Sequence, residues 1–213
     1  MPLALLVVLA VLSGAGQIAA RRSGPLWLHY LLKPLTVVII ISIAVVHPGN
    51  DADYRWLVLL GLFFSLGGDV FLMLPADLFV YGLSAFLLGH LCYIAAFYSP
   101  PQYDLASAAV VVTAGVAGVA LYRHLLPGLG KLKAAVAFYT AAILLMACLA
   151  ALRALSIPGV SSSLALSGAL LFVVSDSALA LDRFRKALAQ REVVVMTSYY
   201  AAQALIASSV AFT

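Results

Sequence analysis

The sequence GLFFSLGGDVFLML, residues 61–74, carries a carboxylate, Asp69, within an otherwise apolar segment. A charged side chain at the centre of a membrane-spanning helix costs roughly 2.5–3.5 kcal/mol on insertion scales. Such residues therefore usually face the protein interior, where they serve a function or pair with a cation. The segment predicts a membrane-spanning helix whose acid has a function or a partner within the protein.

The chain contains a second segment of this kind. Residues 168–181, GALLFVVSDSALAL, carry Asp176 eight residues after a glycine, which is also the spacing before Asp69. The two aspartates are 107 residues apart in a chain of 213. We therefore predict one transmembrane domain made of two four-helix halves, 1–103 and 104–213, related by an axis along the membrane normal. Such an axis would bring the two carboxylates opposite each other near the centre.

The composition is typical of a polytopic membrane protein, because 65% of the residues are hydrophobic and only 9% are charged. A soluble protein would need polar surface that these long apolar runs do not supply. The basic residues are scattered through short loops, so nucleic acid is not an expected partner. We predict an all-α fold of eight transmembrane helices. The expected spans are Pro2–Ala20, Trp27–Val46, Tyr54–Met73, Leu78–Tyr98, Asp104–Tyr122, Leu132–Arg153, Val160–Leu181 and Val193–Phe212, with breakers such as Pro100-Pro101 between them.

Charge predicts the orientation of these spans. The first apolar run resembles a signal peptide, but no basic residue precedes it, whereas Arg21 and Arg22 follow it, which favours a retained first span. Nine Lys and Arg residues belong to the loops after the odd-numbered spans, against two on the other side. Because cytoplasmic loops carry the excess of positive charge, both termini are predicted to face away from the cytoplasm, in a protein of the cell membrane.

Five polar side chains share one depth in this topology. At about 1.5 Å per residue, counting inward from the cytoplasmic helix ends places them roughly 8–11 Å below the surface. They come from five different helices, which suggests a site. We call this set the polar layer; its members are Lys33, Asp69, Tyr139, Asp176 and Tyr199.

A deeper helical face belongs near the polar layer. His90 shares one stripe with Phe86, Tyr93 and Phe97, at steps of three and four residues. In the last span, Tyr199 and Gln203 share a face, with Tyr200 beside them. An aromatic packing face around a hydrogen-bonded histidine accounts for the first stripe equally well.

Two buried carboxylates close together are not readily both ionised, so one is expected to act as an acid and the other as a base. Lys33 could neutralise one of them or bind a phosphate group, and alternatively its side chain could extend to the membrane interface. The carboxylates could also form purely structural pairs with Lys33 or with tyrosine hydroxyls. If the layer is a lipid site, a single lipid chain would lie against Phe86 and Phe97.

Other chemistries find little support in the sequence. The motifs GxSxG, HExxH and CxxC are absent, and the histidines lack the spacing of metal ligands. Cys92 and Cys148 lie within apolar runs and are expected to be small buried hydrophobes. Ser175, next to Asp176, is expected to bond to the backbone or to another helix. The order Gly67-Gly68-Asp69 differs from the GxGD motif of intramembrane aspartyl proteases, and no PAL tripeptide is present.

The sequence resembles the YhhN-like lysoplasmalogenase family across all eight predicted spans. The resemblance rests on an ordered set of short motifs: Lys33-Pro34-Leu35, Gly68-Asp69 with Leu72, the Gly82/Phe86/His90/Tyr93 stripe, Ser175-Asp176, and Tyr199-Tyr200 with Gln203. It implies an eight-helix membrane enzyme that hydrolyses the vinyl ether bond of lysoplasmalogens to a fatty aldehyde and a glycerophospho-base. It also implies that Asp69 and Asp176 are the catalytic acid/base pair, and that a lysophospholipid substrate and membrane lipid are the partners.

We accordingly predict a hydrolase without metal or organic cofactor. Its predicted substrate-binding residues are Lys33, Phe86, His90, Tyr93, Tyr139, Tyr199, Tyr200 and Gln203. Two alternatives use the same carboxylates. One is a small proton-coupled transporter, and the other is a lipid-binding membrane protein without catalytic activity.

Overall fold

The computed structural model describes residues 1–100 and 104–213, and it confirms the all-α fold with eight helices long and apolar enough to span a membrane. The chain is therefore a multi-pass membrane protein. Each helix is close to or longer than the roughly 20 residues that are needed to cross a hydrocarbon core of about 30 Å. The helices are α1 (Leu3–Ser23), α2 (Leu26–Val46), α3 (Ala52–Met73), α4 (Phe79–Phe97), α5 (Leu105–Leu125), α6 (Lys133–Ser156), α7 (Val160–Phe184) and α8 (Arg191–Ser209), with short 3₁₀ turns η1 (Leu126–Gly128), η2 (Gly130–Leu132) and η3 (Val210–Phe212).

Several helices extend beyond the predicted spans into charged sequence. α1 continues to Ser23, α7 continues to Phe184, and α8 begins at Arg191. Hydropathy marks the part of a helix in hydrocarbon, whereas basic residues at the interface continue the same backbone hydrogen bonding. The predicted breaker at Pro101 and the predicted boundary between halves at residue 103 lie outside the described residues.

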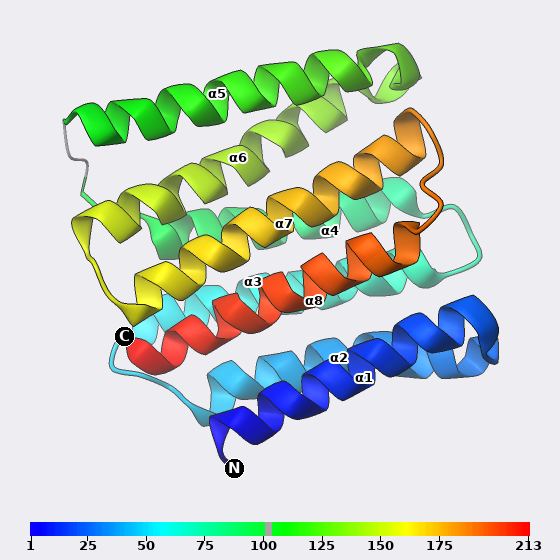
Figure 1. The fold of residues 1–213 in the computed structure, drawn as a ribbon, viewed down its shortest axis with the longest axis horizontal. Coiled ribbons are helices and arrows are strands. Elements are labelled where there is room, and N and C mark those ends of the chain that lie inside the picture. Colours follow the sequence, from blue (N-terminus) through cyan, green and yellow to red (C-terminus); the bar gives the residue numbers. More distant parts are fainter. Residues whose placement is uncertain (101–103) are drawn as a thin grey trace.

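The helices form a bundle with both termini at one end (Figure 1). The loops that join α1 to α2, α3 to α4, α5 to α6 and α7 to α8 lie at the other end. Neighbours in sequence pack as pairs, most extensively α3 with α4 and α7 with α8. α5 lies at the edge of the bundle and packs mainly against α6.

Glycines bring α4 unusually close to α3. A Cβ atom at Gly61 would lie 2.3 Å from Cε1 of Tyr93, and one at Gly68 would lie 2.6 Å from the Phe86 ring. These aromatic rings therefore occupy space that a larger residue on α3 would fill. This packing fixes the rotation of α4, and with it the direction in which His90 points.

The two halves of the chain surround their aspartates in corresponding ways. Asp69 on α3 is contacted from α2 and α8, and Asp176 on α7 is contacted from α6 and α4. With an offset of four helices, α2 corresponds to α6 and α8 corresponds to α4. This correspondence supports the proposal of a 4+4 repeat, which remains a proposal.

Candidate active site

Both aspartates line one cavity of about 230 Å³. It lies toward the end of the bundle opposite the two termini, where the α1–α2, α3–α4 and α7–α8 loops lie. The cavity lies between α1, α2, α3, α4, α7 and α8, and Arg21 and Arg191 line it at their helix ends. Asp69 and Asp176 therefore face a shared space, although they belong to helices more than a hundred residues apart. The other polar residues around this cavity include Lys33, Ser175, Glu192 and Tyr199.

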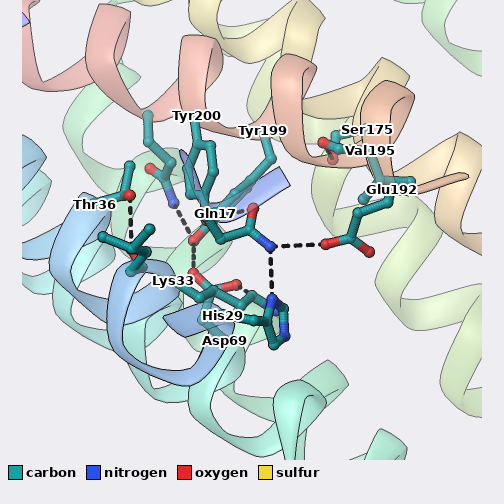
Figure 2. Close-up of polar contacts among 12 residues, drawn as sticks. Gln17, His29, Lys33, Thr36, Asp69, Ser175, Glu192, Val195, Tyr199 and Tyr200 are labelled. Atoms are coloured by element: carbon teal, nitrogen blue, oxygen red, sulfur yellow. Dashed lines mark hydrogen bonds and ion pairs between the residues drawn. The ribbon is translucent and has the colours of Figure 1, made fainter. Parts of the chain in front are cut away.

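Asp69 is paired with a cation. Its Oδ1 lies 3.2 Å from Lys33 Nζ, and its Oδ2 accepts a hydrogen bond of 2.6 Å from the Tyr199 hydroxyl (Figure 2). Both members of the ion pair are nearly inaccessible to solvent. An adjacent ammonium and a donated hydrogen bond both favour the ionised form of a carboxylate. These two contacts therefore offset part of the cost of burying a charge at Asp69.

A chain of hydrogen bonds fixes the Tyr199 hydroxyl from behind. Tyr93 donates to Gln203 Oε1 at 2.7 Å, and Gln203 Nε2 donates to the Tyr199 oxygen at 3.3 Å. Because the amide nitrogen can only donate, the Tyr199 proton is free to point at Asp69. Tyr93 and Gln203 thus lie behind the site and orient a group that faces it.

Asp176 has different neighbours. Its Oδ2 accepts a hydrogen bond from the Tyr139 hydroxyl and lies 3.3 Å from His90 Nε2. His90 Nε2 is also 3.0 Å from the Tyr139 oxygen, and its Nδ1 has no partner among the described residues. A bare ring nitrogen is less costly to bury than an N–H, so the Nε2–H tautomer fits this environment. The Asp176 side chain is 12% exposed, against 3% for Asp69, and is the more accessible of the two.

An aromatic wall lies between the partners of the two aspartates. Phe172 packs edge-on against His90, with ring centroids 4.7 Å apart, and against Tyr199 at 5.5 Å. Phe86 packs edge-on against the same tyrosine at 5.7 Å. These apolar rings lower the local polarity around the acids, which strengthens every electrostatic interaction there.

The residues predicted to bind substrate divide into three groups. Lys33, Phe86 and Tyr199 line the cavity with the aspartates, whereas Tyr139 lines an adjoining apolar groove that also reaches Asp176. The remaining residues that were predicted to bind substrate do not line the cavity, because their side chains contact other helices. The candidates behind the cavity are His90, Tyr93, Tyr200 and Gln203.

Phe97 was expected to contact the lipid chain, but its position contradicts this expectation. Phe97 is fully buried and stacks on Tyr93, with ring centroids 6.0 Å apart, away from the cavity. The adjoining groove, about 40 Å³, instead runs between α4, α5, α6 and α7. It shares Leu72, Phe86, Asp176 and Leu179 with the cavity. Ser175 bonds to the backbone of α8 as expected, through the carbonyl of Val195 at 3.0 Å.

Three residues of the site were not predicted. Gln17 Nε2 lies 2.8 Å from both His29 Nδ1 and Glu192 Oε1, as Figure 2 shows. Gln17 carries a polar amide within the apolar first span, near the cytoplasmic helix end from which the polar layer was counted. That position could have identified it as a member of the site. Glu192 falls just outside the predicted eighth span, and His29 was not among the predicted site residues.

Comparisons with known proteins agree on the family. The model of the YhhN family matches residues 28–210. Lysoplasmalogenase TMEM86A of Bos taurus is 32% identical over 88% of this chain and 80% of its own length. Lysoplasmalogenase of Mycobacterium bovis is 35% identical over 86% of this chain and 72% of its own length. Human lysoplasmalogenase TMEM86B is 36% identical over 86% of this chain and 75% of its own length. No solved structure gives a significant match to the chain.

Proposed function

The chain belongs to the YhhN family, and we propose that it is a membrane hydrolase that cleaves the vinyl ether bond of lysoplasmalogens. The products are a fatty aldehyde and a glycerophospho-base. The observation that carries the proposal is that two carboxylates share one cavity but differ in their partners. Relatives named lysoplasmalogenase, which the chain matches over most of their length, support the substrate class.

The different partners suggest a division of roles. Lys33 and Tyr199 hold Asp69 as a carboxylate, which makes it the base. Asp176 also accepts a hydrogen bond, from Tyr139, but among the described residues no lysine or arginine lies beside it. It is therefore the more readily protonated of the two and the more accessible, and we assign it as the proton donor. His90 touches Asp176 from behind and acts as a positioning residue.

Vinyl ether hydrolysis requires little more than these two groups. Asp176 transfers its proton to the alkenyl carbon that is not bonded to oxygen, and the remaining C–O unit becomes an oxocarbenium ion. Asp69 removes a proton from water, whose oxygen attacks the carbon bonded to the ether oxygen and forms a hemiacetal. The bond between the hemiacetal carbon and the glycerol oxygen then breaks, and the glycerol oxygen takes up the proton that Asp69 removed from water. The hydroxyl proton of the hemiacetal passes to Asp176, so both carboxyl groups return to their starting states and the aldehyde is released. General acid and base catalysis with charge stabilisation accounts for every step.

The shape of the site suits a single-chain lipid. The alkenyl chain would follow the apolar groove that continues from Asp176, and the phosphate would lie at the mouth near Arg21 and Arg191. We propose that Lys33 pairs with Asp69 and does not bind the phosphate, since its ammonium already contacts that carboxylate. We also propose that the mouth opens to the cytoplasmic leaflet of the cell membrane, with both termini on the opposite side.

Release of fatty aldehyde tests the proposal. Purified protein in detergent micelles or vesicles should release one aldehyde per lysoplasmalogen consumed, and should leave the matched saturated 1-alkyl lysophospholipid intact. The control is the folded Asp69→Asn/Asp176→Asn double variant. Absence of aldehyde from the wild-type protein would reject the enzyme and favour the transporter or the lipid-binding protein.

A further inference from the structure

A second polar cluster lies at the mouth of the cavity and has no part in the chemistry above. Gln17 from α1 is fully buried, and its amide lies between His29 of α2 and Glu192 of α8 (Figure 2). Its Oε1 accepts a hydrogen bond from Tyr200 at 3.3 Å. Both ends of the amide are therefore engaged, which holds the Glu192 carboxylate in one position.

Glu192 presents its negative charge to the cavity. One carboxylate oxygen is held by Gln17 at 2.8 Å, while the other lies 4.0 Å from Arg191 Nη1. The Glu192 side chain is partly accessible and lines the cavity. Arg191 is already engaged, because its Nε lies 2.9 Å from Asp182 Oδ2. The second oxygen of Glu192 is thus available to a cation that enters from outside the protein.

Charges of both signs lie side by side at this mouth. Arg21 and Arg191 supply positive charge, and Glu192 supplies negative charge within a few ångströms of Arg191. Phosphate esters of amino alcohols carry a phosphate and an ammonium separated by only two carbon atoms. We infer that Glu192, positioned by Gln17, binds the ammonium group of the lysolipid headgroup. This inference rests on the proposed function, since it names the headgroup that the same site accepts.

A purely structural role for Glu192 predicts different behaviour. An acid in the first turn of α8 also stabilises the helix through its dipole, and the Gln17 contact ties α1 to α8. Loss of such a role would weaken every ligand equally. Loss of an ammonium contact would weaken only ligands that carry the cation.

The test is equilibrium binding of saturated 1-alkyl lysophospholipids, which lack the vinyl ether. Three headgroups are compared on one chain length: phosphoethanolamine, phosphocholine and N-acetylated phosphoethanolamine, which has no cation. The wild-type protein should bind the first or second more tightly than the third. Glu192→Gln keeps an acceptor for Gln17 and should weaken binding of the cationic headgroups about 10- to 100-fold, the usual value of a charged hydrogen bond. Binding of the N-acetylated lipid should change by less than about twofold. The larger loss identifies ethanolamine or choline as the preferred headgroup.

Controls separate this inference from folding and from the proposed function. Asp77→Asn removes the same charge from the loop between α3 and α4, outside the cavity, and should leave all three affinities unchanged. Glu192→Asp keeps the charge and should retain most of the preference. Equal affinity of the wild-type protein for all three lipids, or an equal loss for all three in Glu192→Gln, would overturn the inference. Aldehyde release is measured on the same preparations, so its absence would refute the proposed function while the binding data stand on their own.

Discussion

Asp176→Asn is expected to reduce kcat for aldehyde release by at least about 10²–10⁴-fold, the usual contribution of a general acid. Asparagine keeps the volume and can still accept the hydrogen bond from Tyr139, but it cannot deliver a proton. Because no lysine or arginine in the described part of the chain contacts Asp176, the substitution leaves no such cation buried and unpaired. The thermal midpoint should therefore stay within a few degrees of the wild-type value. Steady-state kinetics and thermal unfolding of the same purified sample measure both quantities, and retained turnover in folded protein would remove Asp176 from the chemistry.

Asp69→Asn should reduce turnover by a similar factor and should also destabilise the protein. Lys33 is 7% exposed, and without the carboxylate its ammonium is left buried and unpaired. Breaking one side of a buried ion pair costs about 3–5 kcal/mol. The combined variant Lys33→Met/Asp69→Asn removes the unpaired cation, so it should recover most of the thermal stability while its turnover stays low.

This combined variant also separates two interpretations of the ion pair. If Lys33 and Asp69 only hold α2 against α3, then restoring stability should restore turnover. If Asp69 is the base, then turnover should remain as low as in the single variant. Recovery of aldehyde release together with the thermal midpoint would place the pair among the structural contacts.

The sequence was sufficient to predict the number of helices and to predict that polar residues from different helices lie at one level of the bundle. Long apolar runs and short loops determine the eight spans, and counting residues from their ends placed Lys33, Asp69, Tyr139 and Asp176 at one level. The structure joins these residues in two pairs, Lys33 with Asp69 and Tyr139 with Asp176. This shared level is predictable because the rise of a helix per residue is constant.

The rotation of each helix about its axis was not predictable from the same count. It depends on close packing, such as that of Tyr93 against Gly61, which turns His90 behind Asp176 instead of into the cavity. The ends of the helices were equally difficult to predict, because hydropathy gives no signal for the charged residues that continue a helix beyond the membrane. For this reason Glu192 was assigned to a loop, although it belongs to the first turn of α8.

The most direct test of the two-carboxylate account is to run the reaction in D₂O and reduce the aldehyde at once to the alcohol. If a fixed acid protonates the alkenyl carbon, then each product molecule should carry one deuterium at the carbon next to the former carbonyl, in a single configuration. The rate should also be lower in D₂O, since transfer of this proton is part of the slow step. Product without deuterium at that carbon, or with deuterium in both configurations equally, would contradict protonation by Asp176 within the cavity.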